Sequence, residues 1–366
     1  SVAFSKDLLV EGTQIIGFEN TQPIPTRYPS AGGQYSTGAF YADYRQDVSK
    51  KSTLNMGARF TYTRLKAIWN EAALMNANLS SVSTRNTSLT ATLGYVIRPD
   101  NKWQLNTIFS SGFRAPNIDD LGKIRESNGS LSVPNPNLNP EFAYNAEMGI
   151  VRYLKDKKNY IALNVYHTWI RDFIGRSSYN LSTDTTSANP NTVLYNDDEL
   201  QTIANVNLGN AIVYGGSFDA KSMLSSAFSF STHLTYTIGS ALGNQYPLPS
   251  ISPLFGNASI YWKQKQWNAH ITFEFSEAKS PNKYSIGGED GIEETPIVDL
   301  EADAEELRYN GTPSWNTIHV GVEYQVSKSL KIQGFIENIF DVHYREFASG
   351  ISAPGRSLTL VGRLNL

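Results

Sequence analysis

The chain has no cysteine, no long apolar run and no marked excess of either charge, and each absence removes a class of protein. Without cysteine there is neither a disulfide scaffold nor a thiolate metal site. No apolar run reaches the length of about 18 residues that a transmembrane helix needs. A formal net charge of −3 with no basic stripe argues against nucleic acid as a partner.

Catalytic constellations are missing as well. The sequence has no nucleophile elbow, no metal-binding pair of histidines one helical turn apart and no glycine-rich phosphate loop. His343, close to Asp341 and Tyr344, is the one cluster of the kind that a hydrolase would use. We therefore predict no enzyme activity, no catalytic residue, no metal site and no bound cofactor.

A signal peptide is also absent, because residues 1–9 contain no basic segment, apolar stretch or small-residue cleavage site. We expect the sequence to start either at a mature end or inside a longer protein. The absence of cysteine suits folding in an oxidising compartment without disulfides.

What the chain has instead is a regular alternation of short and long links between predicted strands. Short polar links are predicted at 47–51, 98–101, 154–158, 224–226, 264–266 and 326–329. Long links are predicted at 20–34, 69–83, 115–139, 177–198, 242–252, 280–310 and 341–356. A meander with tight turns on one rim and long loops on the other is typical of an outer-membrane β-barrel, which has short periplasmic turns and longer extracellular loops.

Apolar and polar residues alternate with a period of two in about 14 segments, which predicts strands. These segments are 9–19, 35–46, 52–68, 86–97, 102–114, 140–154, 158–175, 199–224, 226–240, 254–263, 267–278, 312–326, 329–340 and 357–366. In 226–240, for example, Phe228 and Leu234 alternate with Ser229 and His233. Each strand therefore has one apolar and one polar face.

Large aromatic residues gather at the ends of these segments. Those beside short links are Trp103, Trp262, Trp267, Tyr153 and Tyr160, and those beside long links are Trp69, Trp169 and Trp315. Two aromatic belts of this kind are expected where a barrel meets the two membrane–water interfaces.

The predicted fold is an all-β, transmembrane, antiparallel up-and-down barrel. The predicted strands are much longer than the roughly 5–6 residues typical of a sandwich. No helical layer is predicted that could cover their apolar faces. The alternative is a soluble, carbohydrate-binding β-protein, which would need to bury those faces within itself.

Several motifs resemble those of TonB-dependent outer-membrane transporters. They are 112–121 (GFRAPNIDDL), 134–141 (PNPNLNPE), 145–149 (NAEMG), 205–219 (NVNLGNAIVYGGSFD), 337–341 (ENIFD), 344–346 (YRE) and 353–356 (APGR). Their order and spacing within 86–153, 205–219 and 312–366 carry the resemblance. Leu366 departs from the family, in which an aromatic residue is common at the final position.

The resemblance implies a barrel of about 22 strands whose lumen is filled by an N-terminal plug domain. A short box on the plug would bind the energising partner TonB. Because about 14 strands are readable, we expect residues 1–366 to be the C-terminal part of the barrel, with the plug and the first strands outside this sequence. A self-closed barrel of about 14 strands, acting as a passive channel, is the alternative.

In function, the resemblance implies a receptor in the bacterial outer membrane, surrounded by lipid and lipopolysaccharide, that imports a large, scarce solute. We favour a ferric chelate of the siderophore type over haem. Haem-uptake members carry a histidine between two of the motifs, and residues 117–134 contain none. His233, His270 and His319 are predicted to face inward, where such residues usually bind water or the plug.

The candidate ligand contacts lie on two long links at the extracellular rim. They are Arg114, Asn117, Asp119 and Asp120 on the first link, and His343, Tyr344 and Arg345 on the second. Alternation turns Arg114 toward the lumen. There it contacts either a ligand or the plug, or it pairs with an aspartate and holds the loop.

Two further links have distinctive compositions. Link 280–310 contains nine carboxylates and is expected to be a solvated acidic loop that repels anionic ligands. Its spacing does not match an EF-hand calcium loop. Link 177–198 is rich in serine, threonine and asparagine and is expected to be a mobile loop.

Overall fold

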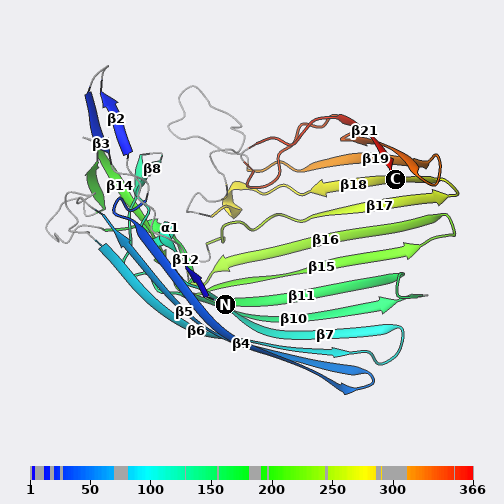
Figure 1. Ribbon diagram of the computed structural model, residues 1–366, viewed down its shortest axis with the longest axis horizontal. Helices are drawn as coiled ribbons and strands as arrows, with labels where there is room; N and C mark the ends of the chain where they lie inside the picture. The colour runs from blue at the N-terminus through cyan, green and yellow to red at the C-terminus, as the bar shows by residue number, and fades with distance from the viewer. Residues whose placement is uncertain are drawn as a thin grey trace.

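One antiparallel sheet dominates the fold (Figure 1). The computed structural model describes residues 2–4, 12–16, 20–24, 28–69, 81–127, 129–154, 156–180, 191–195, 198–243, 246–285, 290, 311–349 and 351–365. Within these ranges, no helix is both long enough and apolar enough to cross a membrane.

The large sheet has 14 strands, which pair in the order in which they occur along the chain. They are β1 (Val2–Phe4), β4 (Gly33–Ser49), β5 (Ser52–Ile68), β6 (Ser81–Ile97), β7 (Trp103–Arg114), β10 (Glu141–Tyr153), β11 (Tyr160–Arg171), β15 (Ala211–Met223), β16 (Phe228–Ala241), β17 (Phe255–Gln264), β18 (Trp267–Ser276), β19 (Trp315–Gln325), β20 (Leu330–Glu337) and β21 (Ser357–Leu364). All neighbouring pairs are antiparallel. This up-and-down meander confirms the predicted fold class.

The links between these strands sort onto two rims. The short ones are 50–51, 98–102, 154–159, 224–227, 265–266 and 326–329. The long ones are 69–80, 115–140, 172–210, 242–254, 277–314 and 338–356. Figure 1 shows the short hairpins together at one end of the sheet. The predicted alternation is confirmed, and the two ends are called the short-turn rim and the long-loop rim below.

The two faces of the sheet differ in chemistry, as β11 shows. Leu163 and Val165 are each 47% exposed on what we call the outer face. Tyr166, which follows Val165, lies with the other even-numbered residues of β11 on the inner face, where its hydroxyl shares a hydrogen bond of 2.7 Å with the Thr237 hydroxyl. A continuous surface of exposed apolar side chains is the pattern of a lipid-covered wall.

Three predicted strands differ from the structure. Of segment 9–19, the described residues form β2 (Gly12–Ile16), which pairs with β3 (Asn20–Ile24) in a separate hairpin, and its remaining residues lie outside the described ranges. Segment 158–175 leaves the large sheet after β11, where Asp172 adopts a φ of 56°. Segment 199–224 is two strands, because Gly209 has a φ of 90°. A positive φ breaks the extended path that a strand needs.

A second, smaller sheet lies at the long-loop rim. Its strands are β12 (Ile174–Ser178), β14 (Asp198–Asn207), β9 (Ser130–Ser132) and β8 (Arg125–Ser127), with β13 (Thr192–Tyr195) paired to β14. A buried core that includes Leu65, Leu121 and Leu131 joins this sheet and the short helix α1 (Ile118–Leu121) to β5 and β6. The described parts of links 115–140 and 172–210 therefore form a packed layer on the inner side of the large sheet.

Two predicted loops need correction. The predicted mobile loop 177–198 contains β13 and the end of β12, whereas residues 181–190 and 196–197 lie outside the described ranges. Of the acidic link 280–310, only 280–285 and Asp290 are described. They include a short 3-10 helix, η1 (Pro281–Lys283), and Asp290 itself is buried rather than solvated.

The aromatic belts are confirmed in part. Trp169 and Trp267 are 48% and 45% exposed on the outer face, near the long-loop rim and the short-turn rim respectively. Trp69 is instead buried in the core of the smaller sheet, and the Trp315 ring packs on Tyr344. These two residues do not face lipid, because the ends of their strands are covered by the long links.

Replacing Gly209 with alanine should destabilise the protein by about 1 kcal/mol, because an L-residue in the left-handed region costs that much or more. Thermal melting of the detergent-solubilised protein measures the change. Gly362→Ala is the matched control, since Gly362 lies on β21 without a positive φ and an added Cβ would meet no atom within 4 Å. Equal melting temperatures for the two variants would contradict this account of the strand break.

Candidate functional site

The first group of predicted site residues lies where β7 ends. Arg114 is the last residue of β7 and lies on the inner face, as alternation predicted. Its guanidinium donates to both carboxylate oxygens of Asp120, at 2.8 and 3.1 Å. The Asp120 side chain is 2% exposed, whereas that of Arg114 is 43% exposed. The aspartate is therefore sealed inside, and the arginine keeps one side open to the lumen.

Helix α1 positions that aspartate through a capping box. Asn117 is the N-cap, and its side-chain oxygen accepts from the backbone N–H of Asp120 at 3.0 Å. In return, Asp120 accepts from the backbone N–H of Asn117 at 2.9 Å. An Asn at the N-cap and a carboxylate three residues later satisfy two backbone donors that the helix itself leaves unpaired. Asn117 is thus a structural residue of the loop.

Asn205 and Asn135 complete this network, and the sequence did not single them out as site residues. The Asn205 amide donates to Asp120 at 2.7 Å, and the Asn135 amide donates to the backbone oxygen of Asn205 at 2.8 Å. The hydroxyl of Tyr179 donates to Asn135 at 3.1 Å. Both asparagines belong to motifs quoted above, but their partners lie far away in sequence, so only the fold brings them together.

The second group lies on the link between β20 and β21. The Asn338 amide donates to the Val342 carbonyl at 2.8 Å, and its oxygen accepts from the Val342 N–H at 2.9 Å, which closes a tight turn. The Tyr344 ring packs on Trp315 with centroids 4.3 Å apart, and burial raises the pKa of the Tyr344 hydroxyl. His343 is exposed and shares a hydrogen bond of 2.9 Å with Ser352.

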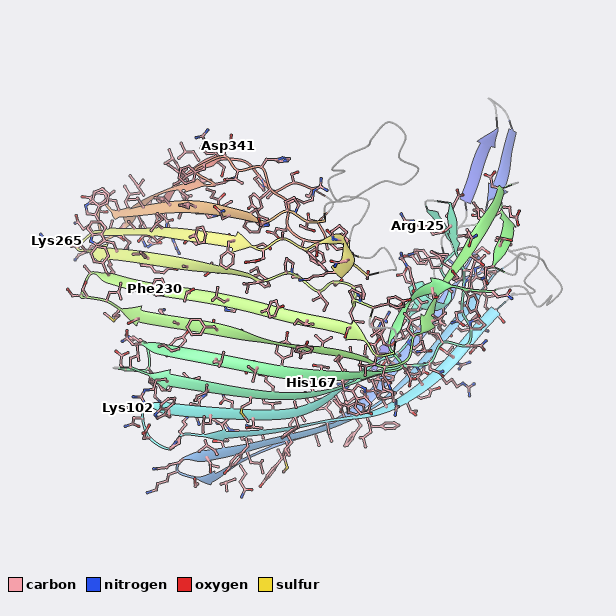
Figure 2. The ribbon with its side chains drawn as sticks, turned by 180° about the vertical axis from the view of Figure 1, so that it is seen from behind. Lys102, Arg125, His167, Phe230, Lys265 and Asp341 are labelled. Carbon is pink, nitrogen blue, oxygen red and sulfur yellow. The ribbon has the colours of Figure 1, made fainter. Side chains whose placement is uncertain are left out.

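The structure does not bring these two groups together. Figure 2 shows Asp341, two residues before His343, well separated from Arg125, which follows the end of α1 by four residues. Asp119 and His343 are both exposed, whereas Arg345 is half-buried. Asp119 also accepts a hydrogen bond of 3.2 Å from the Tyr28 hydroxyl. The predicted contacts therefore form two separate groups along the long-loop rim, Arg114 to Asp120 and His343 to Arg345, which we call the two stations.

A buried ion pair between these stations was missed by the sequence analysis. Lys279 and Asp290 approach to 3.3 Å with side chains 4% and 0% exposed. Asp290 accepts from the backbone N–H groups of Ser250 and Ser285, at 2.6 and 2.8 Å, and the ammonium lies 4.0 Å from the Phe347 ring centroid. Burial lowers the pKa of Lys279 below its ordinary 10.5, and Asp290 opposes that shift. The pair ties three long links together.

The three histidines expected to face inward lie on the inner face in the ladder register. His233 contacts the Asp219 carboxylate at 2.7 Å, and His319 contacts the Thr317 hydroxyl at 2.8 Å. No group of three or more His, Asp or Glu side chains in the described ranges is arranged to hold a metal ion. These histidines are held by wall neighbours of the same strand or the next one.

Taken together, the sheet and its links define a membrane-spanning barrel wall with an elaborated extracellular rim. The family model for "TonB dependent receptor-like, beta-barrel" matches residues 9–339. The chain therefore belongs to the TonB-dependent receptor β-barrel family and resides in the bacterial outer membrane. The resemblance inferred from the motifs is confirmed.

Individual relatives are distant in sequence. The iron-regulated outer membrane virulence protein of Vibrio cholerae serotype O1 is 23% identical over 262 residues, which cover 68% of this chain and 35% of that protein. The copper transporter OprC superposes with a TM-score of 0.67 and 15% identity, covering 89% of this chain and 47% of that one. The siderophore receptor PiuA of Acinetobacter baumannii superposes with a TM-score of 0.65 and 14% identity, covering 94% and 44%. The chain thus spans about a third of its curated relatives and under half of these solved chains.

Asp120→Ala should loosen the β7–α1 link by about 2 kcal/mol, because Arg114 and Asn205 both lose a charge-assisted partner. Limited proteolysis of the folded protein should then cut within 115–140 faster than in the parent. Asp119→Ala is the control, since Asp119 is exposed and should leave the cutting rate nearly unchanged. The network is not what holds this link if both variants are cut at the same rate.

Lys279 should make the stability of the long-loop rim depend on pH. Its folded-state pKa lies below 10.5, so the unfolded chain binds more protons between those two values and stability rises with pH in that window. The contribution is lost as pH falls through the folded-state pKa. The melting temperature of the parent, measured relative to that of Lys279→Met, should rise from neutral pH toward about pH 10. A constant gap would contradict the depressed pKa.

Proposed function

We propose that this chain is the C-terminal part of a receptor that imports a ferric chelate across the outer membrane with energy from TonB. The observation that carries the proposal is the family match over residues 9–339. The name of the Vibrio cholerae relative, an iron-regulated protein, favours iron as the cargo metal. A haem ligand is less favoured, because no histidine occurs in residues 117–134, which lie between the motifs at 113–116 and 135–138.

The proposal places the plug domain and the first strands outside this sequence. The short coverage of relatives and solved chains supports that division. Among the described strands, β1 and β21 stand at opposite ends of the sheet order. Unpaired strand edges are highly unfavourable in lipid, because no water is present to satisfy their backbone groups. Additional strands would close the barrel between these two edges.

The inner face suits contact with a polar domain such as a plug. A hollow of about 430 Å³ in the wall is lined by Tyr261, His270 and Gln333, among other inner-face residues. An added Cβ at Gly321 would lie 2.2 Å from the His270 ring, so this glycine makes room for the ring against the wall. Polar side chains of a plug could exchange hydrogen bonds with such a surface, whereas acyl chains could not.

Ligand capture is assigned to the exposed side chains of the two stations, Asp119 and His343 foremost. Arg114 contributes its open guanidinium edge to the lumen side of the first station. The buried network around Asp120 and the Lys279–Asp290 pair would hold the links that carry these groups. A rigid rim reduces the entropy lost when a ligand is bound.

Uptake by bacteria tests the proposal directly. Cells that lack their own iron receptors and express the full-length protein should accumulate iron from a ferric siderophore only when TonB is present. His343→Ala should weaken chelate binding about tenfold, as expected for one contact worth about 1.4 kcal/mol. His167→Ala is the matched control, because His167 lies on the outer face between Val165 and Trp169.

Two results would argue against the proposal. TonB-independent uptake would favour a passive channel over an energised receptor. The protein purified from native membranes could also have an intact mass near 40.6 kDa, the mass of residues 1–366 alone. That result would exclude a plug domain and additional strands.

A further inference from the structure

Three basic side chains gather on the outer face near the long-loop rim. Arg64 of β5 lies directly opposite Arg85 of β6, and Lys66 follows two residues along β5 on the same face. Both arginines are exposed. Directly opposite residues in an antiparallel pair have Cβ atoms about 4.5–5.5 Å apart, and like charges placed so are destabilising. We call Arg64, Lys66 and Arg85 the basic cluster.

No protein group in the described ranges neutralises the basic cluster. None of its three side chains makes an ion pair or a hydrogen bond there, although Arg114, Arg171 and Lys279 each have an acidic partner. The next residues toward the membrane on this face are Tyr62 and Thr87, which carry no charge. Among the described residues, the cluster is thus a patch of positive charge without an acidic neighbour, and it points away from the lumen.

The other side of the same strand ends is firmly held. Leu65, Ala67 and Val82 alternate with the basic residues and are at most 3% exposed in the core shared with the smaller sheet. The backbone beneath the cluster therefore cannot readily turn the arginines apart. The repulsion between them is built into a packed part of the fold, and no acidic side chain among the described residues relieves it.

An apolar track leads from the basic cluster toward the membrane interior. Along the outer face of β6, Arg85 and Thr87 are followed by Leu89, Ala91 and Leu93 at two-residue spacing. Leu89 is 70% exposed and Leu93 45%. At about 3.4 Å per residue, Ala91 lies roughly 20 Å along the strand from Arg85, which is about the length of an extended acyl chain.

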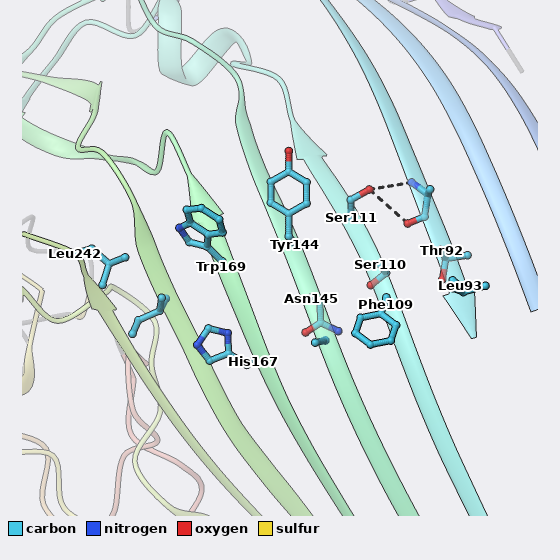
Figure 3. Close-up of a pocket in the computed structure, with 13 residues that line it drawn as sticks. Thr92, Leu93, Phe109, Ser110, Ser111, Tyr144, Asn145, His167, Trp169 and Leu242 are labelled. Atoms are coloured by element: carbon cyan, nitrogen blue, oxygen red, sulfur yellow. Dashed lines mark hydrogen bonds between the residues drawn. The ribbon is translucent and has the colours of Figure 1, made fainter. Parts of the chain in front are cut away.

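The track ends in a hollow of about 770 Å³ on the outer face (Figure 3). The hollow exists because β6 and β7 pair only up to Thr92 and Ser110 and diverge beyond that point. There the Ser111 hydroxyl substitutes for the ladder, accepting from the Ala91 N–H at 2.9 Å, as the dashed lines in Figure 3 mark. Its walls include Phe109, Tyr144, His167 and Trp169, and its exposed lining is mostly apolar.

We propose that the basic cluster and the hollow together bind one lipid of the outer leaflet that carries both phosphate and acyl chains. The phosphate would take bidentate hydrogen bonds from Arg64 and Arg85, the geometry that guanidinium groups offer to phosphate. The acyl chains would follow Leu89 into the hollow. The hollow reaches from β6 to Leu242, just past the end of β16, and neighbouring strands lie about 4.8 Å apart, so it has room for several chains side by side.

The joined apolar track is what selects a lipid over other anions. A free phosphate would use the cluster alone and leave the hollow without a role. An acidic protein partner would meet the cluster but would have no reason to reach about 20 Å down a face built for acyl chains. This site does not depend on the cargo or on TonB, so its test is independent of the transport proposal.

Lipid binding to the full-length protein in a nonionic detergent tests the site. Lipid A, which has phosphates and several acyl chains, should raise the melting temperature of the parent and remain bound in native mass spectrometry. Each surface cation near anionic lipid contributes about 1 kcal/mol, so Arg64→Gln/Arg85→Gln should bind lipid A about 30-fold more weakly. Without lipid, the double variant should melt no lower than the parent, because like charges have been removed.

The controls separate the lipid from simpler ligands. Arg59 lies on the inner face of β5, near the Tyr41 ring. The control variant Arg59→Gln should therefore bind lipid A as tightly as the parent does. Dephosphorylated lipid A binding as tightly as lipid A, or inorganic phosphate producing the same rise in melting temperature, would overturn the proposal. Unchanged affinity in the double variant would overturn it as well.

Discussion

Backbone hydrogen bonding in the absence of water is the constraint on which the structure depends. Every N–H and C=O within the membrane must find a partner in the protein. The long antiparallel ladders from β4 to β21 meet that requirement, and strands that follow one another in the sheet pair across both the short and the long links. The two-residue alternation of the strand then separates an apolar outer face from a polar inner face.

The constraint ends at the membrane boundary, and the fold changes there. Beyond the ladder, water and side chains can satisfy the backbone, so the long links can form a helix, a small sheet and tight turns. Asp120 shows how these links are held: one buried carboxylate accepts from Arg114, Asn205 and the backbone of Asn117. The Lys279–Asp290 pair has the same role farther round the rim. The Asp120 network and the Lys279–Asp290 pair are both polar, because the loops that they join lie over a lumen rather than over a hydrocarbon core.

The same boundary explains the basic cluster on the outer side. Arg64 and Arg85 lie on the outer face four residues beyond Phe60 and Leu89, where a side chain that points outward meets headgroups instead of acyl chains. Within the wall, a charge on that face would be costly. At the edge of the wall, the same charge can bind a lipid phosphate. The hollow between the diverging strands β6 and β7 supplies the apolar half of that site.

The site could be predicted from sequence only where its partners are close along the chain. Arg114 and Asp120 lie six residues apart, and the Arg–Asp alternative for this loop was stated from the sequence and is present in the structure. Asn205 lies 85 residues from Asp120, so no local pattern could join them. The breaks at Asp172 and Gly209 were also missed, because a positive φ marks each of them and the residue pattern alone does not specify that backbone conformation.

Sequence alone determined the class of fold, the sorting of short and long links and the two faces of the wall, because these follow from the two-residue period and from turn composition, both of which are local. The tertiary structure decided which loop residues meet, which aspartates are buried and which tryptophans leave the lipid face. Those outcomes depend on contacts between segments tens of residues apart. The position of Arg64 opposite Arg85 likewise required the register of two paired strands, which neither strand specifies by itself.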